Sequence, residues 1–347
     1  MSDLPVIPNI HVTGRQSFKR CRLQFQLREK ERLIPAQWKH IPFIVGDIFH
    51  ASLDAYYNNW NAKTSTGSCD IGAETLFDTY QKALHDLRNE EADASIIEEL
   101  ENQWPLLDSM YCEYVAECQD RDKSFTGVQT QVRLSHTIET PRGRANLVGT
   151  LDALVRIGDQ LWVMEHKTAA SFKDDELIIL DDQANAYMWL VEKIYGSVAG
   201  VIYNQVRKKL PPKPTPIANG SRLSAIVKDT TYAVYLAAIQ EYGFKAADYE
   251  DILYELQHKN NYCKRAMIPK SKPRLQQFDE YLPYELALMI DPDCVYFPTQ
   301  TWDCARFCDY YLICKTHIDG GDTDDIKQFC YRVNENHRAL ENDSDVE

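Results

Sequence analysis

Two apolar, β-branched runs separated by a Gly-Asp pair constrain the fold of this 347-residue chain more than any other stretch. The runs cover residues 147–157 and 161–164, and Gly158-Asp159 lies between them. A Gly-Asp pair in this position predicts a two-residue hairpin turn. Ile157 then faces Gln160, and each further step pairs the next two residues outward.

This hairpin register brings acidic residues together. Asp152 lies opposite Glu165, and because side chains alternate along a strand, Lys167 shares their face while His166 points to the other. Directly opposed Cβ atoms are roughly 4.5–5.5 Å apart, so two carboxylates there repel each other. A divalent cation such as Mg²⁺ or Mn²⁺ prefers oxygen ligands and would remove this repulsion. The alternative is two solvated carboxylates on an open sheet face, since one bulge would shift the register.

Composition limits the class of protein. The chain is 44% hydrophobic and 26% charged, which is enough for a sizeable core in one large domain or two. It contains no run of about 18 apolar residues, and residues 1–5 lack a secretory pattern, so we expect an intracellular protein without a membrane span. The net charge of -14 argues against a broadly basic nucleic-acid-binding surface, although a local basic channel remains compatible with it.

The pattern around the hairpin predicts a mixed sheet flanked by helices. Residues 127–138 alternate and should form a strand paired with the hairpin. A helix is expected at about 174–195 and a strand at 198–206, and this order implies a right-handed crossover and a parallel strand pair. Residues 74–122 are mostly helical and polar, which predicts a helical lobe before the sheet.

Three polar residues on two of the predicted helices do not indicate a function by themselves. His50 lies off the most apolar stripe of its helix, with Gly46 one turn earlier, where a glycine permits a close approach. A lone histidine in a helix is usually structural. Gln183 and Tyr187 are one turn apart and form one patch.

The cysteines form the second strong feature. Cys304, Cys308 and Cys314 lie within eleven residues, and in a reducing compartment this suggests a soft metal with a fourth ligand from elsewhere. Three buried structural cysteines, or a zinc site in a scaffold protein, are the alternatives. Cys21 is expected on a helix with Ser17 as its N-cap and, taken alone, is a small core residue.

Two basic stretches stand out in this acidic chain. They contain Arg207, Lys208 and Lys209 in the first and Lys264 and Arg265 in the second. Charge runs are usually solvated loops, and contacts to nucleic-acid phosphates are the competing interpretation.

Five separated elements together give the chain a family resemblance. The motifs are Gly46-Asp-Ile-Phe-His50, Gly149-Thr-Leu-Asp152, Glu165-His-Lys167 and Gln183-Ala-Asn-Ala-Tyr187, followed by the late cysteines. With them the chain resembles the PD-(D/E)xK nuclease superfamily over about residues 15–320. The similarity is to its RecB-like branch with an iron–sulfur cluster, which includes AddB-type helicase–nucleases, CRISPR adaptation exonucleases and stand-alone phage forms.

The resemblance implies a restriction-endonuclease-like α/β fold and a role for each motif residue. His50, Asp152 and Glu165 would bind Mg²⁺ or Mn²⁺ together with the His166 carbonyl, and a histidine ligand favours Mn²⁺. Lys167 would orient or activate the attacking water and stabilise charge near the phosphate. The remaining motif residues, Gln183 and Tyr187, would position the DNA or the lysine.

The implied activity is DNA cleavage that leaves 5′-phosphates. We expect an exonuclease acting on single strands or ends, with 5′-to-3′ polarity, in recombination, repair or replication. Its partners would be DNA and proteins of those processes, in the cytoplasm of a bacterium or of a phage-infected cell. A non-catalytic DNA-binding or assembly factor is the alternative function, although such a factor would need neither the carboxylates nor the lysine.

The resemblance also assigns the cysteines to a structural [4Fe–4S] cluster held by Cys21, Cys304, Cys308 and Cys314. The late spacing here is three and then five residues, whereas many relatives have two and then five. The expected organisation is an N-terminal segment (1–45), a helical lobe (46–125), a nuclease core with C-terminal helices (126–300), a cysteine segment (301–320) and an acidic tail (321–347).

Overall fold

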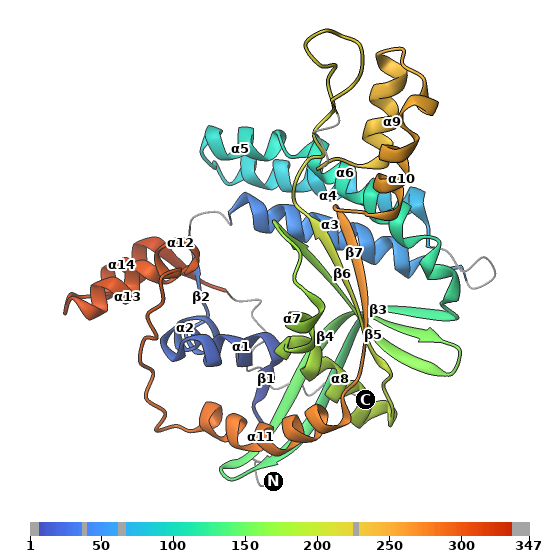
Figure 1. The fold of residues 1–347 in the computed structure, drawn as a ribbon. Coiled ribbons are helices and arrows are strands. Elements are labelled where there is room, and N and C mark those ends of the chain that lie inside the picture. The colour runs from blue at the N-terminus through green and yellow to red at the C-terminus, as the bar shows by residue number, and fades with distance from the viewer. Residues whose placement is uncertain (1–6, 37–39, 62–66, 225–228, 335–347) are drawn as a thin grey trace.

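The computed structural model describes residues 7–36, 40–61, 67–224 and 229–334, and confirms a central mixed sheet flanked by helices (Figure 1). Six strands form this sheet and two short strands pair separately. The strands are β1 (Asn9–His11), β2 (Leu33–Pro35), β3 (Gly127–Thr140), β4 (Gly143–Ile157), β5 (Gln160–Ala169), β6 (Gly200–Arg207), β7 (Cys263–Pro269) and β8 (Tyr331–Val333).

The helices lie on both faces of the sheet. They are α1 (Val12–Arg20), α2 (Arg22–Phe25), α3 (Ile41–Asn58), α4 (Cys69–Asn89), α5 (Ala94–Glu101), α6 (Trp104–Cys118), α7 (Asp175–Ile179), α8 (Asp182–Tyr195), α9 (Tyr232–Glu241), α10 (Glu250–His258), α11 (Lys272–Ile290), α12 (Cys304–Phe307), α13 (Tyr311–Ile318) and α14 (Asp324–Cys330). Short 3₁₀ turns cover Arg121–Ser124 and Ala246–Tyr249, and a π-helical turn covers Gln26–Lys30.

The hairpin forms as the sequence predicts. Gly158 has a φ of +57°, which a glycine adopts readily in a tight turn, and Ile157 pairs with Gln160. The antiparallel pairing of β4 with β5 then continues to Ala153 and Met164. It ends one step before the two carboxylates.

The pairing ends there because two strands share one edge of β4. β3 pairs with β4 from residue 143 to residue 156 and thereby occupies one edge. On the other edge, β5 pairs with residues 153–157 and β1 pairs in parallel with residues 146–148. Residues 149–152 therefore lie between β1 and β5, where the sheet opens.

The connection after β5 follows the predicted order. β5 and β6 are parallel, with Glu165 beside Tyr203. The single helix expected at 174–195 is instead two, α7 and α8, since Asp181 caps α8 by accepting hydrogen bonds from Gln183 N and Ala184 N.

Each face of the sheet buries its own core. Helices α1, α8 and α11 pack on the face that presents Leu154 and Val163. The helices of the predicted lobe, α3, α4 and α6, pack on the opposite face, which presents Val155 and Met164 (Figure 1). Two smaller clusters lie beside these cores, one between α9 and α10 and one between the N-terminal helices and the C-terminal segment.

The first helix differs from its prediction. It begins at Val12, so Ser17 lies inside it and is not its N-cap. Cys21 is not on the helix, because its backbone is extended (φ -161°, ψ 118°) and separates α1 from α2. The break turns Cys21 toward the C-terminal segment, whose residue Thr299 donates its N–H to Cys21 Sγ at 3.3 Å.

The C-terminal acidic tail is described only in part. A short helix, α14, and strand β8 occupy its first half, and β8 pairs antiparallel with β2. Residues 335–347 of the predicted tail lie outside the described residues. No helix within the described ranges is long and apolar enough to span a membrane.

Candidate active site

Asp152 lies at the point where the sheet opens. Its Oδ2 accepts a hydrogen bond from the backbone N–H of His166 at 2.7 Å, and this bond takes the place of strand pairing. Its Oδ1 lies 3.6 Å from Nδ1 of His50. Helix α3 supplies His50 from the opposite face of the sheet, so the open edge lets a helix of one layer reach a carboxylate of the other.

Glu165 and Lys167 lie beside Asp152 on the same face, as predicted. Glu165 is buried, and its Oε1 forms an ion pair with Lys167 Nζ. The second oxygen, Oε2, is also buried and has no hydrogen-bond partner among the described residues. A buried carboxylate oxygen without a partner is costly, which makes it a candidate ligand atom.

Helix α8 completes the row of polar groups. Lys167 Nζ donates to Gln183 Oε1 at 3.0 Å, and Gln183 Nε2 donates to Tyr187 Oη at 2.9 Å. The helix approaches the sheet closely at Gly149, where an added Cβ would lie 2.8 Å from a ring carbon of Tyr187. Gly149 is therefore required by the packing of α8. At Gly46 an added Cβ would make only an ordinary contact of 3.4 Å with Thr168 Oγ1.

The electrostatic environment shifts the pKa values of the two carboxylates in opposite directions. Burial would raise the pKa of Asp152, but the hydrogen bond from His50 and the nearby positive groups lower it to about 2. Burial raises the pKa of Glu165 to about 7 and the charge of Asp152 adds to this, while Lys167 opposes it. Burial lowers the pKa of His50, yet its hydrogen bond and attraction to Asp152 outweigh burial and the net pKa is raised.

The ammonium group of Lys167 is held in its charged form. Burial would lower its pKa, but the charge and hydrogen bond of Glu165 raise it overall. Lys167 is thus a cation at neutral pH and not a base.

The donor set fits a divalent cation. His50, Asp152 and Glu165 offer one imidazole and two carboxylates at the sheet opening, and Glu165 Oε2 has no other partner. Imidazole and carboxylate ligands suit Mn²⁺, and carboxylates alone suit Mg²⁺. Within the described residues no three histidine, cysteine or acidic side chains converge closely enough to form a complete ion site.

The His166 side chain points to the other face, as the alternation predicts. Its ring stacks on Tyr57, with centroids 5.7 Å apart, and meets the edge of Tyr114. Burial lowers its pKa to about 3, so the ring is neutral. Its backbone N–H, in contrast, reaches the face that carries Asp152.

Asp54 and Gln131 belong to the site, although their sequence positions did not single them out. Asp54 lies one helical turn after His50, and Gln131 Nε2 donates to its Oδ2 at 2.6 Å. Burial raises the pKa of Asp54 to about 6, and the charge of Asp152 contributes. Gln131 lies between Thr130, which pairs with Ala153, and Val132, which pairs with Leu151, and its φ of +48° is unusual for a residue other than glycine. The helical spacing could have identified Asp54, whereas no sequence signal marks Gln131.

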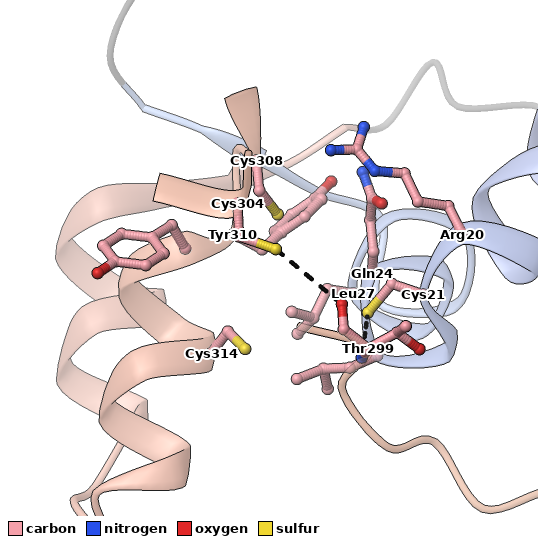
Figure 2. A pocket seen from close by; sticks show the side chains of 11 residues that line it. Arg20, Cys21, Gln24, Leu27, Thr299, Cys304, Cys308, Tyr310 and Cys314 are labelled. Carbon is pink, nitrogen blue, oxygen red and sulfur yellow. Dashed lines mark hydrogen bonds between the residues drawn. The ribbon is translucent and has the colours of Figure 1, made fainter. Parts of the chain in front are cut away.

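Four cysteines line one pocket between the N-terminal residues 20–27 and the C-terminal residues 299–314. Cys21, Cys304, Cys308 and Cys314 all line this pocket, and their sulfur atoms face it (Figure 2). Backbone N–H groups donate to two of the sulfurs, from Thr299 to Cys21 and from Thr301 to Cys304, each at 3.3 Å. The structure thus brings together the four residues that the resemblance grouped.

The predicted basic stretches are partly neutralised. Arg207 and Lys209 both pair with Asp229, and Lys264 pairs with Asp175 at 2.9 Å. Lys208 donates to the carbonyl of Pro42 at 3.0 Å. Their contact with DNA stays a prediction.

Arg265 requires a correction. Its side chain is only 3% exposed and forms an ion pair with the fully buried Asp122. Arg265 is on β7, and strand alternation turns it into the core beneath the α3–α6 helices, away from solvent. The prediction that it contacts DNA is therefore wrong.

The raised pKa of Glu165 predicts a pH-dependent stability difference. Its folded-state pKa of about 7 exceeds the ordinary value of 4.5, so its ionisation destabilises the folded state as pH rises through this window. Glu165→Gln should therefore gain stability relative to the parent, on the order of 2–3 kcal/mol, between about pH 5 and pH 8. Urea unfolding of both proteins in a chelating buffer measures this difference; a difference that is constant with pH would contradict it.

Comparisons with known proteins identify the family of the chain. A family model described as the PD-(D/E)XK nuclease superfamily matches residues 12–315. No curated protein matches the chain. The solved structure of SSO0001 is 14% identical, with a TM-score of 0.33, and the match covers 90% of this chain and 88% of that one. A structure described as a "Putative exonuclease" from Eubacterium rectale is 12% identical, with a TM-score of 0.38, and the match covers 86% and 93%.

Both TM-scores are below 0.5, so these two likenesses carry no argument about the site. The family model, in contrast, matches residues 12–315, a range that covers most of the chain. The mixed sheet with helices on both faces is consistent with the restriction-endonuclease-like fold. The chain belongs to the PD-(D/E)XK nuclease superfamily.

Proposed function

We propose that this nuclease is a metal-dependent DNA exonuclease that hydrolyses phosphodiester bonds and leaves 5′-phosphates. The observation that carries the proposal is the convergence of Asp152, Glu165 and Lys167 with His50 where β4 and β5 separate. A binding module would not need two carboxylates and a lysine in one buried row, because the charges are costly there.

The residues that would hold Mg²⁺ or Mn²⁺ are His50, Asp152, Glu165 and the carbonyl of His166. The partnerless oxygen of Glu165 and the low pKa of Asp152 support this assignment. When bound, the ion lowers the pKa of a water molecule and offsets charge at the phosphorus. The water oxygen would bond to phosphorus while the bond to the 3′ oxygen breaks, and the proton lost by the water would balance the proton that the leaving 3′ oxygen takes up to become a hydroxyl.

Lys167 would act on the phosphate as a cation. Its raised pKa keeps it protonated, so it would donate a hydrogen bond to a phosphate oxygen and stabilise negative charge. Gln183 holds the ammonium group by accepting a hydrogen bond, and Tyr187 in turn accepts from Gln183. Helix α8 thereby fixes the direction in which Lys167 points.

We further propose that Cys21, Cys304, Cys308 and Cys314 hold a structural [4Fe–4S] cluster. All four line one pocket, and backbone N–H groups donate to two of the sulfurs. Four cysteines that line one pocket match the four thiolate ligands of such a cluster. The cluster would join α2 to the segment after α11.

The finer substrate choice follows from the resemblance. We expect 5′-to-3′ digestion from strand ends, in recombination, repair or replication, with proteins of those processes as partners. The two basic stretches contain three partly exposed cations, Arg207, Lys209 and Lys264, that would contact the DNA. Its phosphates would compete with the carboxylates to which these cations are now paired.

Digestion of labelled DNA tests the proposal. Single and double strands, linear and circular, each labelled at the 5′ or the 3′ end, are incubated with Mg²⁺ or Mn²⁺. We expect linear substrates to be shortened from the 5′ end, with 5′-phosphorylated products and intact circles. Binding of DNA without cleavage in either metal would favour the non-catalytic alternative, and cleavage of circles would replace the exonuclease by an endonuclease.

A further inference from the structure

A buried polar network lies directly behind the candidate metal site. It connects His166 on β5 to Asn204 on β6 and Arg265 on β7 across the sheet. Tyr57 on α3 and Tyr114 on α6 meet it from the helical side. The 3₁₀ turn after α6 adds the buried carboxylate of Asp122, so the network joins three strands to the helical lobe.

The donors in this network can be assigned because an arginine only donates. Arg265 Nε donates to Asn204 Oδ1 at 2.6 Å, which fixes the orientation of the Asn204 amide. The amide nitrogen therefore faces His166 and donates to its Nδ1 at 3.2 Å. His166 Nδ1 must then be the acceptor, so the proton of the neutral ring is on Nε2.

The ion pair of Arg265 with Asp122 also determines which tyrosine hydroxyl donates a hydrogen bond and which accepts one. Arg265 Nη1 pairs with Asp122 Oδ1, and the hydroxyl of Tyr57 donates to Asp122 Oδ2 at 2.9 Å. Having used its proton, Tyr57 accepts a hydrogen bond from Tyr114 at 2.7 Å. Arg265 Nη2 also donates to Tyr57 at 3.1 Å, so this one guanidinium organises the whole network.

Stability alone is a weak reason for such an arrangement. Taking a charged pair out of water costs several kcal/mol per ion, and apolar residues of similar volume are often equally stable in its place. The other members of the network are also buried, namely Tyr57, Tyr114, Asn204 and Asp122. Apolar side chains at these positions would stabilise the fold equally well, so stability does not explain the polar groups. A network of this kind instead specifies one geometry.

The geometry that it specifies is that of the metal site. His166 lies between Glu165 and Lys167, and its backbone N–H is the donor to Asp152. Holding the His166 ring in place therefore also orients the His166 backbone N–H, which donates the hydrogen bond to Asp152. Tyr57 lies seven residues after His50 on α3, so the two residues share one side of that helix.

We infer that Arg265 is a positioning residue of the metal site, and this inference rests on the proposed function. Through Asn204 it fixes the peptide of His166, and through Tyr57 it fixes helix α3, which carries His50. Arg265 thus joins the two halves of the site, one on the sheet and one on the helical lobe.

The test is Mn²⁺ binding measured by titration calorimetry on Asn204→Leu and Arg265→Lys. Asn204→Leu keeps the volume and removes the link to His166, and Arg265→Lys keeps the charge and removes the fork of donors. Each should weaken Mn²⁺ binding about ten-fold or more, as loss of an outer-shell partner does at other metal sites. Cleavage should recover as Mn²⁺ is raised, because Lys167 remains in place.

Leu286→Ala is the control for a merely structural effect. Leu286 is fully buried on α11, in the core on the other face of the sheet. This variant should lose melting temperature without any change in Mn²⁺ affinity. Parent-like Mn²⁺ affinity in both network variants would overturn the inference while leaving the proposed function intact. A parent protein that neither binds Mn²⁺ nor cleaves DNA would overturn the proposed function, and the inference with it.

Discussion

Lys167→Met is expected to lower the rate of DNA cleavage about 10²–10³-fold, as does removal of a single preorganised donor at other catalytic sites. Lys167 is held as a cation mainly by the charge and hydrogen bond of Glu165, and its hydrogen bond to Gln183 fixes the direction of the ammonium group. Methionine keeps the length of the side chain and removes its charge. Because Lys167 pairs with Glu165, its loss also frees that carboxylate, so Mn²⁺ binding should be retained or become tighter.

The measurement combines single-turnover cleavage at saturating Mn²⁺ with calorimetric Mn²⁺ binding. Lys193→Met is the matched control, since Lys193 is also partly exposed and paired with a carboxylate, Asp279, but lies outside the site. Asp152→Asn should differ from both by losing Mn²⁺ binding together with cleavage. Parent-like cleavage by Lys167→Met would remove the lysine from the mechanism, and a loss that more Mn²⁺ repairs would make it a ligand-positioning group instead.

The hairpin at the centre of this site could be predicted because its information is local. Two adjacent residues, Gly158 and Asp159, set the turn, and alternation then assigns each later side chain to a face. This was sufficient to place Asp152, Glu165 and Lys167 together and to turn the His166 ring away. The partners on α8 could be named only as a patch, although Gly149 now explains why that helix comes close.

The opening of the sheet could not be predicted in this way. It arises because β1, more than a hundred residues earlier in the chain, takes part of the edge of β4. Local periodicity contains no information on such a distant pairing. The same applies to the helix break at Cys21, where the propensity of the flanking residues favours a continuous helix.

Charge was the least reliable guide. Arg265 stands beside Lys264 in sequence, and the pair reads as one basic stretch, yet the two side chains lie on opposite faces of β7. The burial of Arg265 depends on Asp122, a residue 143 positions earlier. Asp54 has no signal of its own for a related reason, because an acidic residue on an amphipathic helix is informative only once its neighbour His50 is recognised.

Of the proposed substitutions, Cys21→Ser is expected to lower the free energy of unfolding the most. Cys21 and Cys304 are 283 positions apart, and a cluster that joins them closes nearly the whole chain into one loop. By the chain-entropy relation for cross-links, a loop of this length contributes on the order of 5 kcal/mol. The variant should lose its iron and its visible iron–sulfur absorption, and its melting temperature should fall by about 10 °C.

The control for this substitution is Cys330→Ser. Cys330 packs in the same small apolar cluster as Cys21, Cys308 and Cys314, but it does not line the cysteine pocket. It should keep iron at the parent level in anaerobically purified protein. Zinc in place of iron in the parent would contradict a [4Fe–4S] cluster, and equal iron in both variants would exclude Cys21 as a ligand. If Cys21→Ser loses iron while Cys330→Ser keeps it, the late spacing of three and five residues is sufficient to complete the site.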